Sequence, residues 1–384
     1  MEYIKLRDIC NTTQGIQISK EEQIEKFEYG YIRYLYIADF KNDDNKKFVI
    51  NNYSEKIVTE SDLVMANTGS PGAVFKGING VLSNNLFKIS LDKSIIDRDF
   101  LYYYLSSKKF QDNLKERLKG GVQKHLGHKT IGEQLIPVID LSSQKKIVNV
   151  LDKAQGIINK RKEQIEALDE LVKSQFIEMF GELKTNENNF DIVDLESLTT
   201  KITDGVHSKP EYTSEGVEFI SVKDINKGKL NFDECKYISQ EAHERYIKRC
   251  RPEIGDVLYT KVGATYGIPA VVDTEREFSL YVSVALLKLK KDIVNPIYIK
   301  EALRSVDVKR QADRQVKGIG VPDLHLIEIK KFKVFNPPIE LQNKFADFVK
   351  QVDKLKFEME KSLKDLEDSF NSLMQKAFNG ELLK

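Results

Sequence analysis

The sequence repeats itself at a distance of 198 residues, and this repeat constrains the fold more than any other feature. "FGELK" at 180–184 returns as "FNGELLK" at 378–384, so Phe180 corresponds to Phe378. Going backward at the same offset, apolar residues mostly meet apolar residues, without a gap, as far as Gln144 and Gln342. A period of about 20 to 50 residues would indicate a solenoid. This much longer period predicts two copies of a domain-sized unit.

The best-preserved part of each copy predicts a long helix. In 144–180 and 342–378 the apolar residues recur at alternating steps of four and three. The mean spacing of about 3.5 residues is typical of a coiled coil, and each helix would be about 50 Å long at 1.5 Å per residue. The predicted seam of the first helix includes Ile147, Leu151, Ile158, Arg161, Ile165, Leu168 and Val172. That of the second includes Phe345, Val349, Val352, Lys356, Met359, Leu363, Leu366 and Phe370.

A helix of this length with one narrow apolar stripe needs a partner that covers the stripe. The pattern leaves open two separate homodimeric coils or one antiparallel pair within the chain. The matched lengths and common register favour the intramolecular pair. Arg161 and Lys356 are polar seam positions, and such positions are expected to set the register of the pair.

Two globular regions precede the helices and share landmarks in the same order. "YIRYLYIADF" (31–40) parallels "VEFISVKDI" (217–225), and "DRDFLYYYLSS" (97–107) parallels "NPIYIKEALRS" (295–305), where Asn295 and Pro296 predict a helix start. Strands and helices mix without steady βαβ alternation, which indicates the α+β class. The predicted organisation is two similar globular domains, 1–141 and 185–338, and two long antiparallel helices, 142–184 and 339–384, in a pseudo-two-fold, nearly circular arrangement.

Composition excludes a membrane protein and leaves nucleic-acid binding open. No apolar run reaches the roughly 18–20 residues of a membrane span, and the first residues lack the layout of a signal peptide. The three cysteines have no paired spacing, which indicates free thiols and a cytoplasmic protein. The net charge of +1 decides nothing about DNA, because a DNA-binding face needs local rather than global basic charge.

Local charge and glycine loops are the features that point to nucleic acid. Basic residues outnumber acidic ones in 108–129 and in 300–317, which occupy the same place in the two copies. The loops "NTGSPG" (67–72) and "KVGATYG" (261–267) each follow a predicted strand, but neither matches a nucleotide-binding motif. They are either tight turns or places where glycine lets the backbone approach a nucleic-acid backbone.

Three motifs resemble catalytic or metal-binding signatures and do not complete them. "NPPI" at 336–339 resembles an adenine methyltransferase motif, but Ile339 cannot stack a flipped base as an aromatic residue does. In "PDLHLIEIK" at 322–330, too few residues separate Asp323 from Glu328 to form a nuclease hairpin. His125 and His128 have no Cys or carboxylate at ligand spacing nearby. We therefore expect no metal site and no catalytic residue in this chain.

Two variable regions, each followed by a near-identical long helix, resemble the specificity subunits of type I restriction-modification enzymes. The resemblance covers the whole chain. It rests on "SDLVMANTGSPG" (61–72) with "GDVLYTKVGATYG" (255–267), on "TDGVHSKP" (203–210) with its weaker partner "TQGIQISK" (13–20), and on helices that close on "FGEL" and "FNGEL". The partner "TQGIQISK" lacks the Asp and His of Asp204 and His207, so the first domain would contact DNA differently.

The resemblance implies a non-catalytic subunit whose two target-recognition domains each read one half of a bipartite site in double-stranded DNA. The paired helices would set the gap between half-sites, which lie about 34–36 Å apart per helical turn. They would also dock two methyltransferase subunits. Those partners would carry S-adenosylmethionine and methylate adenine N6, and two restriction subunits would add ATP- and magnesium-dependent translocation and cleavage. This chain itself would bind no cofactor.

On this interpretation, polar and basic residues of the loops are the expected DNA contacts. In the first domain they are Lys20, Asn67, Ser70, Lys124, His125 and Lys129. In the second they are His207, Lys209, Lys261, Thr265, Tyr266 and Lys317. Two alternatives stay open from the residues alone. One is a self-contained methyltransferase or nuclease, and the other is a coiled-coil scaffold without a DNA role.

Overall fold

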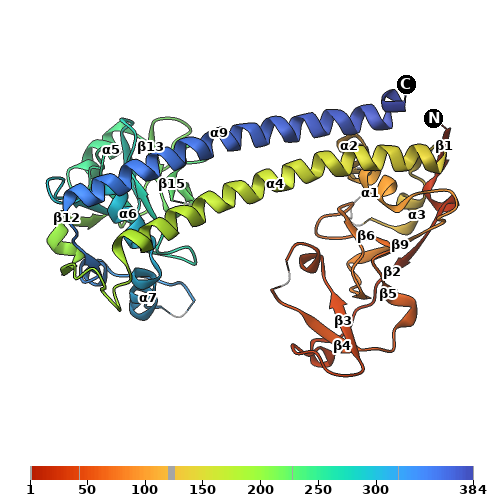
Figure 1. The fold of residues 1–384 in the computed structure, drawn as a ribbon, viewed down its shortest axis with the longest axis horizontal. Helices are drawn as coiled ribbons and strands as arrows, with labels where there is room; N and C mark the ends of the chain where they lie inside the picture. Colours follow the sequence, from red (N-terminus) through yellow and green to blue (C-terminus); the bar gives the residue numbers. More distant parts are fainter. Residues whose placement is uncertain (1, 43, 120–125, 227, 319, 384) are drawn as a thin grey trace. The chain divides into compact units, whose positions relative to one another are not determined.

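The computed structural model describes residues 2–42, 44–119, 126–226, 228–318 and 320–383 and divides into two compact units (Figure 1). Unit 1 comprises Met1–Lys162 with Lys361–Lys384, and unit 2 comprises Glu163–Glu360. Both boundaries fall inside the two longest helices, α4 (Leu141–Phe180) and α9 (Ile339–Phe378). Each unit therefore holds one globular region and the adjoining halves of both helices.

The described residues of unit 1 form three sheets. The antiparallel sheets are β1 (Glu2–Lys5) with β10 (Leu135–Val138), and the order β2 (Cys10–Gln14), β9 (Leu86–Leu91), β6 (Leu63–Ala66), β7 (Val74–Lys76). The mixed sheet has the order β4 (Lys47–Ile50), β3 (Tyr31–Leu35), β8 (Gly80–Leu82), β5 (Ile57–Val58), with β3 and β8 parallel. The helices of the globular region are α1 (Arg98–Ser106), α2 (Lys108–Lys119) and α3 (His128–Gly132).

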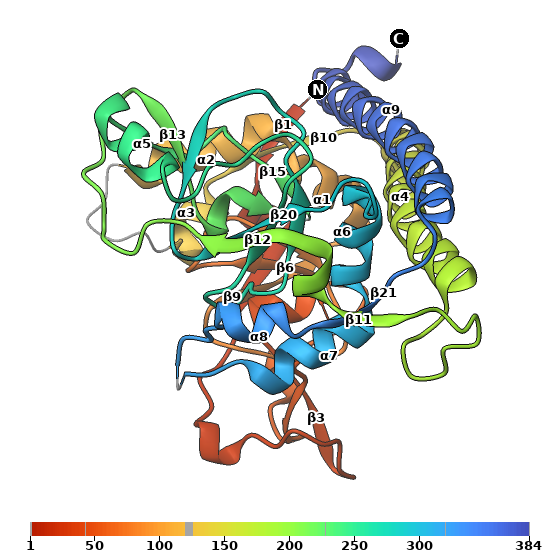
Figure 2. The same ribbon diagram turned by 90° about the vertical axis from the view of Figure 1, so that its left-hand side faces the viewer.

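Unit 2 repeats this plan. β11 (Ile192–Asp194) pairs with β21 (Lys333–Phe335), and the antiparallel sheet runs β12 (Thr199–Asp204), β20 (Val284–Leu289), β17 (Val257–Thr260), β18 (Pro269–Val271). The mixed sheet runs β16 (Lys236–Ile238), β13 (Val217–Ile220), β19 (Phe278–Leu280), and β14 (Ile225–Asn226) pairs with β15 (Lys229–Leu230). The helices are α5 (Gln240–Ile247), α6 (Pro296–Arg304), α7 (Val306–Gln315) and α8 (Leu326–Lys330); Figure 2 shows α6 beside the two long helices.

The predicted α+β class and the internal repeat are confirmed. The strand order β2-β9-β6-β7 of unit 1 returns as β12-β20-β17-β18 in unit 2. The predicted helix start at Asn295 is also confirmed, because its side chain accepts a hydrogen bond from the Ile297 amide at 2.9 Å with Pro296 in the first turn. Asp97 caps α1 in the same way through the amides of Asp99 and Phe100. The repeat thus extends from sequence to topology and capping.

In unit 2, the halves of α4 and α9 pack on each other along the predicted seam. Phe176 and Phe180 of α4 lie 5.5 and 5.4 Å from Phe345 of α9, measured between ring centroids. Farther along, Lys356 Nζ lies 2.6 Å from Asp169 Oδ1. Because the contacts move backward on α9 as they move forward on α4, the helices are antiparallel.

The same pairing occurs in unit 1 between the other halves. Ile147 and Leu151 of α4 share a buried cluster with Met374, Ala377 and Phe378 of α9. All the predicted seam residues in both units are buried or half-buried. Intramolecular antiparallel pairing, predicted over homodimeric coils, is confirmed within each unit.

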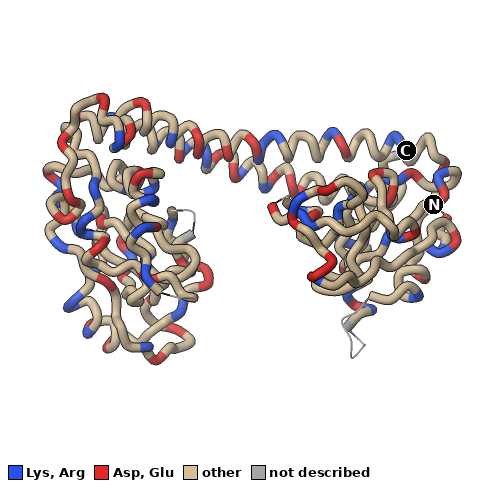
Figure 3. Tube along the Cα trace, turned by 90° about the horizontal axis from the view of Figure 1, so that it is seen from below, with Lys and Arg blue, Asp and Glu red and all other residues tan. Residues whose placement is uncertain are grey.

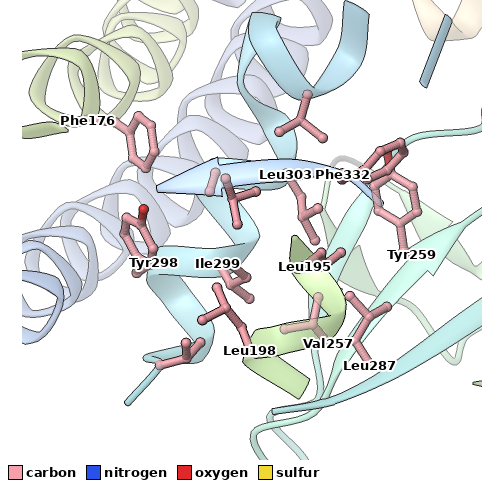
Figure 4. Close-up of a cluster of buried hydrophobic side chains, with 14 of the residues drawn as sticks. Phe176, Leu195, Leu198, Val257, Tyr259, Leu287, Tyr298, Ile299, Leu303 and Phe332 are labelled. Carbon is pink, nitrogen blue, oxygen red and sulfur yellow. The ribbon is translucent and has the colours of Figure 1, made fainter. Parts of the chain in front are cut away.

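In each unit the halves of α4 and α9 pack into the core of the globular region. In unit 2, Figure 4 shows Phe176 of α4 facing Tyr298 of α6, with ring centroids 5.8 Å apart, next to Ile299 and Leu303. In unit 1, Phe378 of α9 lies 5.4 Å from the Phe100 ring of α1. Burying such side chains stabilises the fold by about 1.5–3 kcal/mol each. The helices are therefore integral parts of the units.

Candidate nucleic-acid interface

The two glycine loops are built alike at the ends of corresponding strands. After β6, the Gly72 amide donates to the Ala66 carbonyl at 2.8 Å, and after β17 the Gly267 amide donates to the Thr260 carbonyl at 2.8 Å. Gly72 and Gly267 have φ values of +91° and +89°, a backbone conformation that residues with a Cβ atom rarely adopt. Glycine is therefore needed at both positions to close the tight turn.

In each unit a second segment donates a hydrogen bond to the corresponding backbone carbonyl of the glycine loop. The Leu126 amide donates to the Asn67 carbonyl at 2.9 Å, and the Leu324 amide donates to the Lys261 carbonyl at 2.8 Å. In unit 2, Lys317 and Asp323 close this segment by exchanging two backbone hydrogen bonds of 2.9 and 2.8 Å. In each unit the end of the basic segment and the glycine loop therefore lie together. We call this part of each unit the loop edge.

In unit 2, the segment after β12 joins this edge through a buried carboxylate. Asp204 is 3% exposed, and its Oδ1 atom accepts from Arg249 at 2.7 Å and lies 3.1 Å from His207 Nε2. Lys261 is 5% exposed, and its Nζ lies 3.7 Å from Asp204 Oδ2 and 3.4 Å from Asp323 Oδ1. Charge compensation by these cations allows an ionised carboxylate to be buried. Asp204 thereby fixes three basic side chains from three separate segments.

Unit 1 has an uncharged pair at the corresponding place. Gln14 pairs with Phe87 in the sheet as Asp204 pairs with Ala285. The Gln14 and Asn67 side chains both donate to the Asn84 carbonyl, at 2.9 and 3.0 Å. Unit 1 therefore has Gln14 where unit 2 has Asp204, and Asn67 where unit 2 has Lys261. No charged group takes part in these hydrogen bonds of unit 1.

The glycine loops are also attached to the helices that follow in each unit. The Tyr266 hydroxyl donates to Asp313 Oδ1 at 2.6 Å, and Lys309 Nζ lies 3.6 Å from the centroid of the Tyr266 ring. The hydrogen bond from Tyr266 and the one from Lys309 lower the pKa of Asp313. In unit 1, Gln111 of α2 donates to the Gly72 carbonyl at 2.7 Å. Both loops are held in place before any ligand binds.

The predicted contact residues divide by exposure. Exposed ones are Lys20, Ser70, Lys129, His207, Lys209, Thr265 and Lys317, and Tyr266 is half-buried. Asn67 and Lys261 are buried, so a direct DNA contact would require either side chain to leave its anchor. Lys124 and His125 lie outside the described residues.

Sequence reasoning did not find several side chains at this edge. Arg249 is 45 residues from Asp204 and has no motif around it, so no spacing signal existed. His128 was considered for a metal site, but its Nδ1 lies 2.8 Å from Thr12 Oγ1 and its ring packs 4.4 Å from that of Phe87. Figure 3 shows acidic and basic residues interspersed over both units, so basic charge has to be sought in these small groups.

Metal-ligating side chains do not gather among the described residues. They contain no cluster of three His, Cys, Asp or Glu side chains placed to hold a metal ion. Asp323 and Glu328 of the nuclease-like motif are engaged with Lys261 and Lys317, at 3.4 and 3.9 Å. Across the part of the chain that the structure describes, no helix has the length and apolar character needed to span a membrane.

Comparisons with known proteins agree with this geometry. A family model described as "Type I restriction modification DNA specificity domain" matches residues 1–167 and 187–367. The MjaVIII specificity subunit of Methanocaldococcus jannaschii is 22% identical, over 99% of this chain and 92% of its own. The EcoKI specificity subunit of Escherichia coli K12 is 20% identical, over 97% of this chain and 87% of its own.

Two solved structures share the fold. One, from work on complex assembly and conformational transition of the type I R-M system, has a TM-score of 0.59 at 16% identity and covers 99% of this chain and 98% of that one. The type I restriction-modification S subunit from M. genitalium has a TM-score of 0.51 at 16% identity, covering 98% of this chain and 96% of that one.

Proposed function

The chain belongs to the family of type I restriction-modification DNA specificity subunits, and from this premise we propose that its two globular regions each read one half of a bipartite DNA sequence. It does so as the non-catalytic component of an adenine-N6 methyltransferase, to which restriction subunits add ATP- and magnesium-dependent cleavage. S-adenosylmethionine, ATP and magnesium bind to the partner subunits. The long paired helices set the gap between the half-sites.

The observation that carries this proposal is the loop edge built twice. In each unit a glycine loop and the end of a basic segment meet through one equivalent backbone hydrogen bond, Leu126 to Asn67 and Leu324 to Lys261. Because the two units hold their loops in the same arrangement, they can bind the two strands of a duplex in the same way. The anchors and exposed residues differ between the units, and this supports reading of two different half-sites.

Within this proposal, the exposed residues contact DNA and the buried ones position loops. Lys20, Lys129, Lys209 and Lys317 contact phosphates, while Ser70, His207, Thr265 and Tyr266 offer hydrogen-bonding groups to bases or phosphates. Asn67 and Lys261 hold the glycine loops from beneath. Lys124 and His125 are proposed contacts of the first domain.

Exposed apolar residues on α4 support docking of the methyltransferase subunits. In unit 1, Val150 and Ile157 are 44% and 53% exposed, and their spacing of seven puts them on one face of the helix. In unit 2, Leu171 of α4 is 45% exposed. On α9, Leu355 and Phe357 are exposed as well. We propose that helices of the two methyltransferase subunits cover these residues.

The docking surface can be tested by a matched pair of variants. Ile157→Glu should abolish co-purification with the methyltransferase subunit, because a carboxylate would be buried in an apolar contact. Asn159→Glu adds the same charge two residues away, at another exposed position, and should leave co-purification intact. Equal recovery of both complexes would contradict the proposed surface.

The decisive test of the function is co-expression with a methyltransferase subunit of the same type I system, followed by methylome sequencing. The expected result is N6-methyladenine in one sequence made of two specified parts separated by a fixed number of unspecified bases. Exchanging the residues of the unit 2 edge should change one part only. Methylation by the purified chain alone, or a site of one continuous part, would overturn the proposal.

The two alternatives make opposite predictions. A self-contained methyltransferase or nuclease would turn over DNA when the chain is incubated with labelled S-adenosylmethionine and magnesium. A scaffold without a DNA role would leave random duplex unshifted at low salt even with the methyltransferase subunit present. We expect no turnover by the chain alone and a shift by the complex.

A further inference from the structure

An aromatic cleft opens beside the glycine loop of unit 2. It has a volume of about 550 Å³ and is lined by Tyr212, Phe219 and Tyr281, with Val262 and Gly263 of the glycine loop at its edge. The Gly263 amide donates to the Pro322 carbonyl at 2.8 Å, which ties the cleft to the segment closed by Lys317 and Asp323. The cleft is therefore continuous with the candidate interface.

Three aromatic rings that line the cleft pack against one another. Phe219 is 2% exposed, and its ring centroid lies 6.0 Å from that of Tyr212 and 5.9 Å from that of Tyr281. Lys236 Nζ lies 4.0 Å from the centroid of the Tyr212 ring. Both tyrosine rings therefore pack against the buried Phe219, at interplanar angles of 63° and 56°, and a cation lies over the Tyr212 ring.

Polar groups complete the lining. Ser221, Asp224 and Asn231 face the cleft, as does Lys223. Asp224 Oδ2 accepts from the Ser221 amide and hydroxyl at 2.7 and 2.8 Å, which fixes the carboxylate. The lining thus combines aromatic rings with hydrogen-bond donors and acceptors, two lysines and the acidic residues Asp224 and Glu234. Aromatic rings beside donors, acceptors and lysines match the chemistry of a nucleobase with its phosphate.

The corresponding tyrosine of unit 1 follows the neighbouring strand instead. Tyr36 comes directly after β3, whereas Tyr281 comes directly after β19. The Ser83 amide donates to Leu35 and the Tyr281 amide donates to Ile220, each at 2.9 Å, so Ser83 corresponds to Tyr281. The next residue after each acceptor is Tyr36 in unit 1 and Ser221 in unit 2. Unit 1 thus has Tyr36 beside Ser83 where unit 2 has Ser221 beside Tyr281, and we call this difference the Tyr–Ser exchange.

This exchange changes what the ring does. In unit 1 the Tyr36 hydroxyl donates to Gln23 Oε1 at 2.9 Å, and its ring packs 5.0 Å from that of Tyr34. Tyr36 is therefore engaged within the protein. Tyr281 instead forms one wall of the cleft, next to loops proposed to lie on DNA.

Resting on the DNA-reading function proposed above, we propose that this cleft receives one nucleobase unstacked from the duplex and stacks it on Tyr281. Aromatic side chains stack bases of any identity, and extrusion of a base costs least where it is mismatched. Tyr212 closes the other side, and Lys223 and Lys236 face the adjoining phosphate. The unit 2 half-site therefore contains one position at which a base leaves the helix.

The test is a double-mutant cycle between Tyr281 and single bases. Once the target is known, a set of duplexes carries one abasic site at each position of the unit 2 half-site. Complexes with the methyltransferase subunits are prepared with the wild-type chain, Tyr281→Ala and Tyr281→Phe. We expect Tyr281→Ala to weaken binding of the intact duplex about tenfold, because base–ring stacking is lost. Tyr281→Phe keeps the ring and should bind within about twofold of wild type.

The abasic duplexes identify the stacked base. At one position only, the loss caused by Tyr281→Ala should disappear, because the base that stacks on the ring is already missing. A mismatch at that position should strengthen binding by the wild-type chain and not by Tyr281→Ala, because an unpaired base is easier to extrude.

Three outcomes would overturn the proposal. They are no loss on intact DNA, an equal loss on every abasic duplex, and a mismatch that weakens wild-type binding at the rescuing position. Each is distinguishable from failure of the DNA-reading function, because wild-type selection of the target over random duplex is measured in the same series. If the wild-type complex showed no such selection, the function itself would be wrong.

Discussion

Gln144 in unit 1 and Gln342 in unit 2 make the same three hydrogen bonds. The Gln144 Oε1 atom accepts from the Asp97 amide, and its Nε2 donates to the carbonyls of Ile95 and Ile139, at 2.7, 2.9 and 2.7 Å. Gln342 makes the equivalent bonds to Asn295, Ile293 and Pro337, at 2.9, 3.1 and 2.8 Å. Both side chains are buried. One glutamine thus joins a helix start, the preceding turn and the entry to the long helix.

We predict that Gln342→Leu destabilises unit 2 by about 3 kcal/mol, because the Asn295 amide and the carbonyls of Ile293 and Pro337 lose their side-chain partner. Hydrogen exchange read by mass spectrometry should show faster exchange in peptides around 293–299 and little change in unit 1. Gln144→Leu should give the mirror result in unit 1. Uniform loss of protection across both units would mean that the glutamines do not act locally.

The Lys356–Asp169 pair should respond to charge reversal. Asp169→Lys places two cations at the seam and should lower the free energy of unfolding by about 1–2 kcal/mol. The double variant Asp169→Lys with Lys356→Asp restores opposite charges and should recover most of the loss in a denaturant titration. A double variant as unstable as the sum of its single variants would show that the ion pair contributes nothing across the helices.

The buried Asp204 should tolerate replacement only together with Lys261. Asp204→Asn leaves the Lys261 ammonium with less compensation and should cost about 3 kcal/mol of stability. The double change Asp204→Gln with Lys261→Asn reproduces the neutral pair of Gln14 and Asn67. It should recover stability while weakening DNA binding, because His207 and Arg249 lose their anchor. Full DNA affinity in the double variant would contradict the positioning role of Asp204.

Lysines at the edge should differ in their effect on salt dependence. Lys209→Gln removes an exposed cation and should reduce the slope of log affinity against log salt by about one, for target and random DNA alike. Lys261→Gln changes a buried cation and should weaken binding with little change in slope. Titrations on one duplex at several salt concentrations compare the two. Equal slope changes would place Lys261 on the DNA backbone.

The thiols should be unreactive in the folded protein. Burial raises the pKa of Cys10 and of Cys250 to about 12, so at pH 8 the reactive thiolate is scarce. Iodoacetamide should modify neither residue in the native chain within the time that fully labels the denatured chain. Mass spectrometry of labelled peptides measures this, and rapid native labelling would show that these parts of the cores open.

The helices and the repeat were predictable because their signal is local and periodic. Spacing alone identified Ile147, Leu168 and Phe345 as seam residues, and a capping pair identified Asn295 as a helix start. The loop edge was predictable only in outline, because the glycine loops have a sequence signature and their side-chain partners do not. Burial of Lys261 depends on Asp204 and Asp323, which the sheet brings together from far apart in the chain.

The Tyr–Ser exchange was predictable only in part. Ser83 and Tyr281 are related by the 198-residue offset of the repeat, but only the hydrogen bonds of Ser83 to Leu35 and of Tyr281 to Ile220 reveal that Tyr36 and Ser221 lie on the adjacent strands. The same holds for Arg249, which reaches Asp204 from the end of the segment that contains α5.

The placement of Met374, Ala377 and Phe378 in the core of unit 1 affects the order in which the ribosome can complete this protein. Unit 2 is one continuous stretch, so all of its core side chains have been synthesised once residue 360 has been added. Unit 1 begins earlier but lacks part of its interior until 361–384 emerge. Unit 1 is therefore translated first but completed last, and a nonsense codon near residue 365 would remove part of the unit 1 core while leaving all of unit 2.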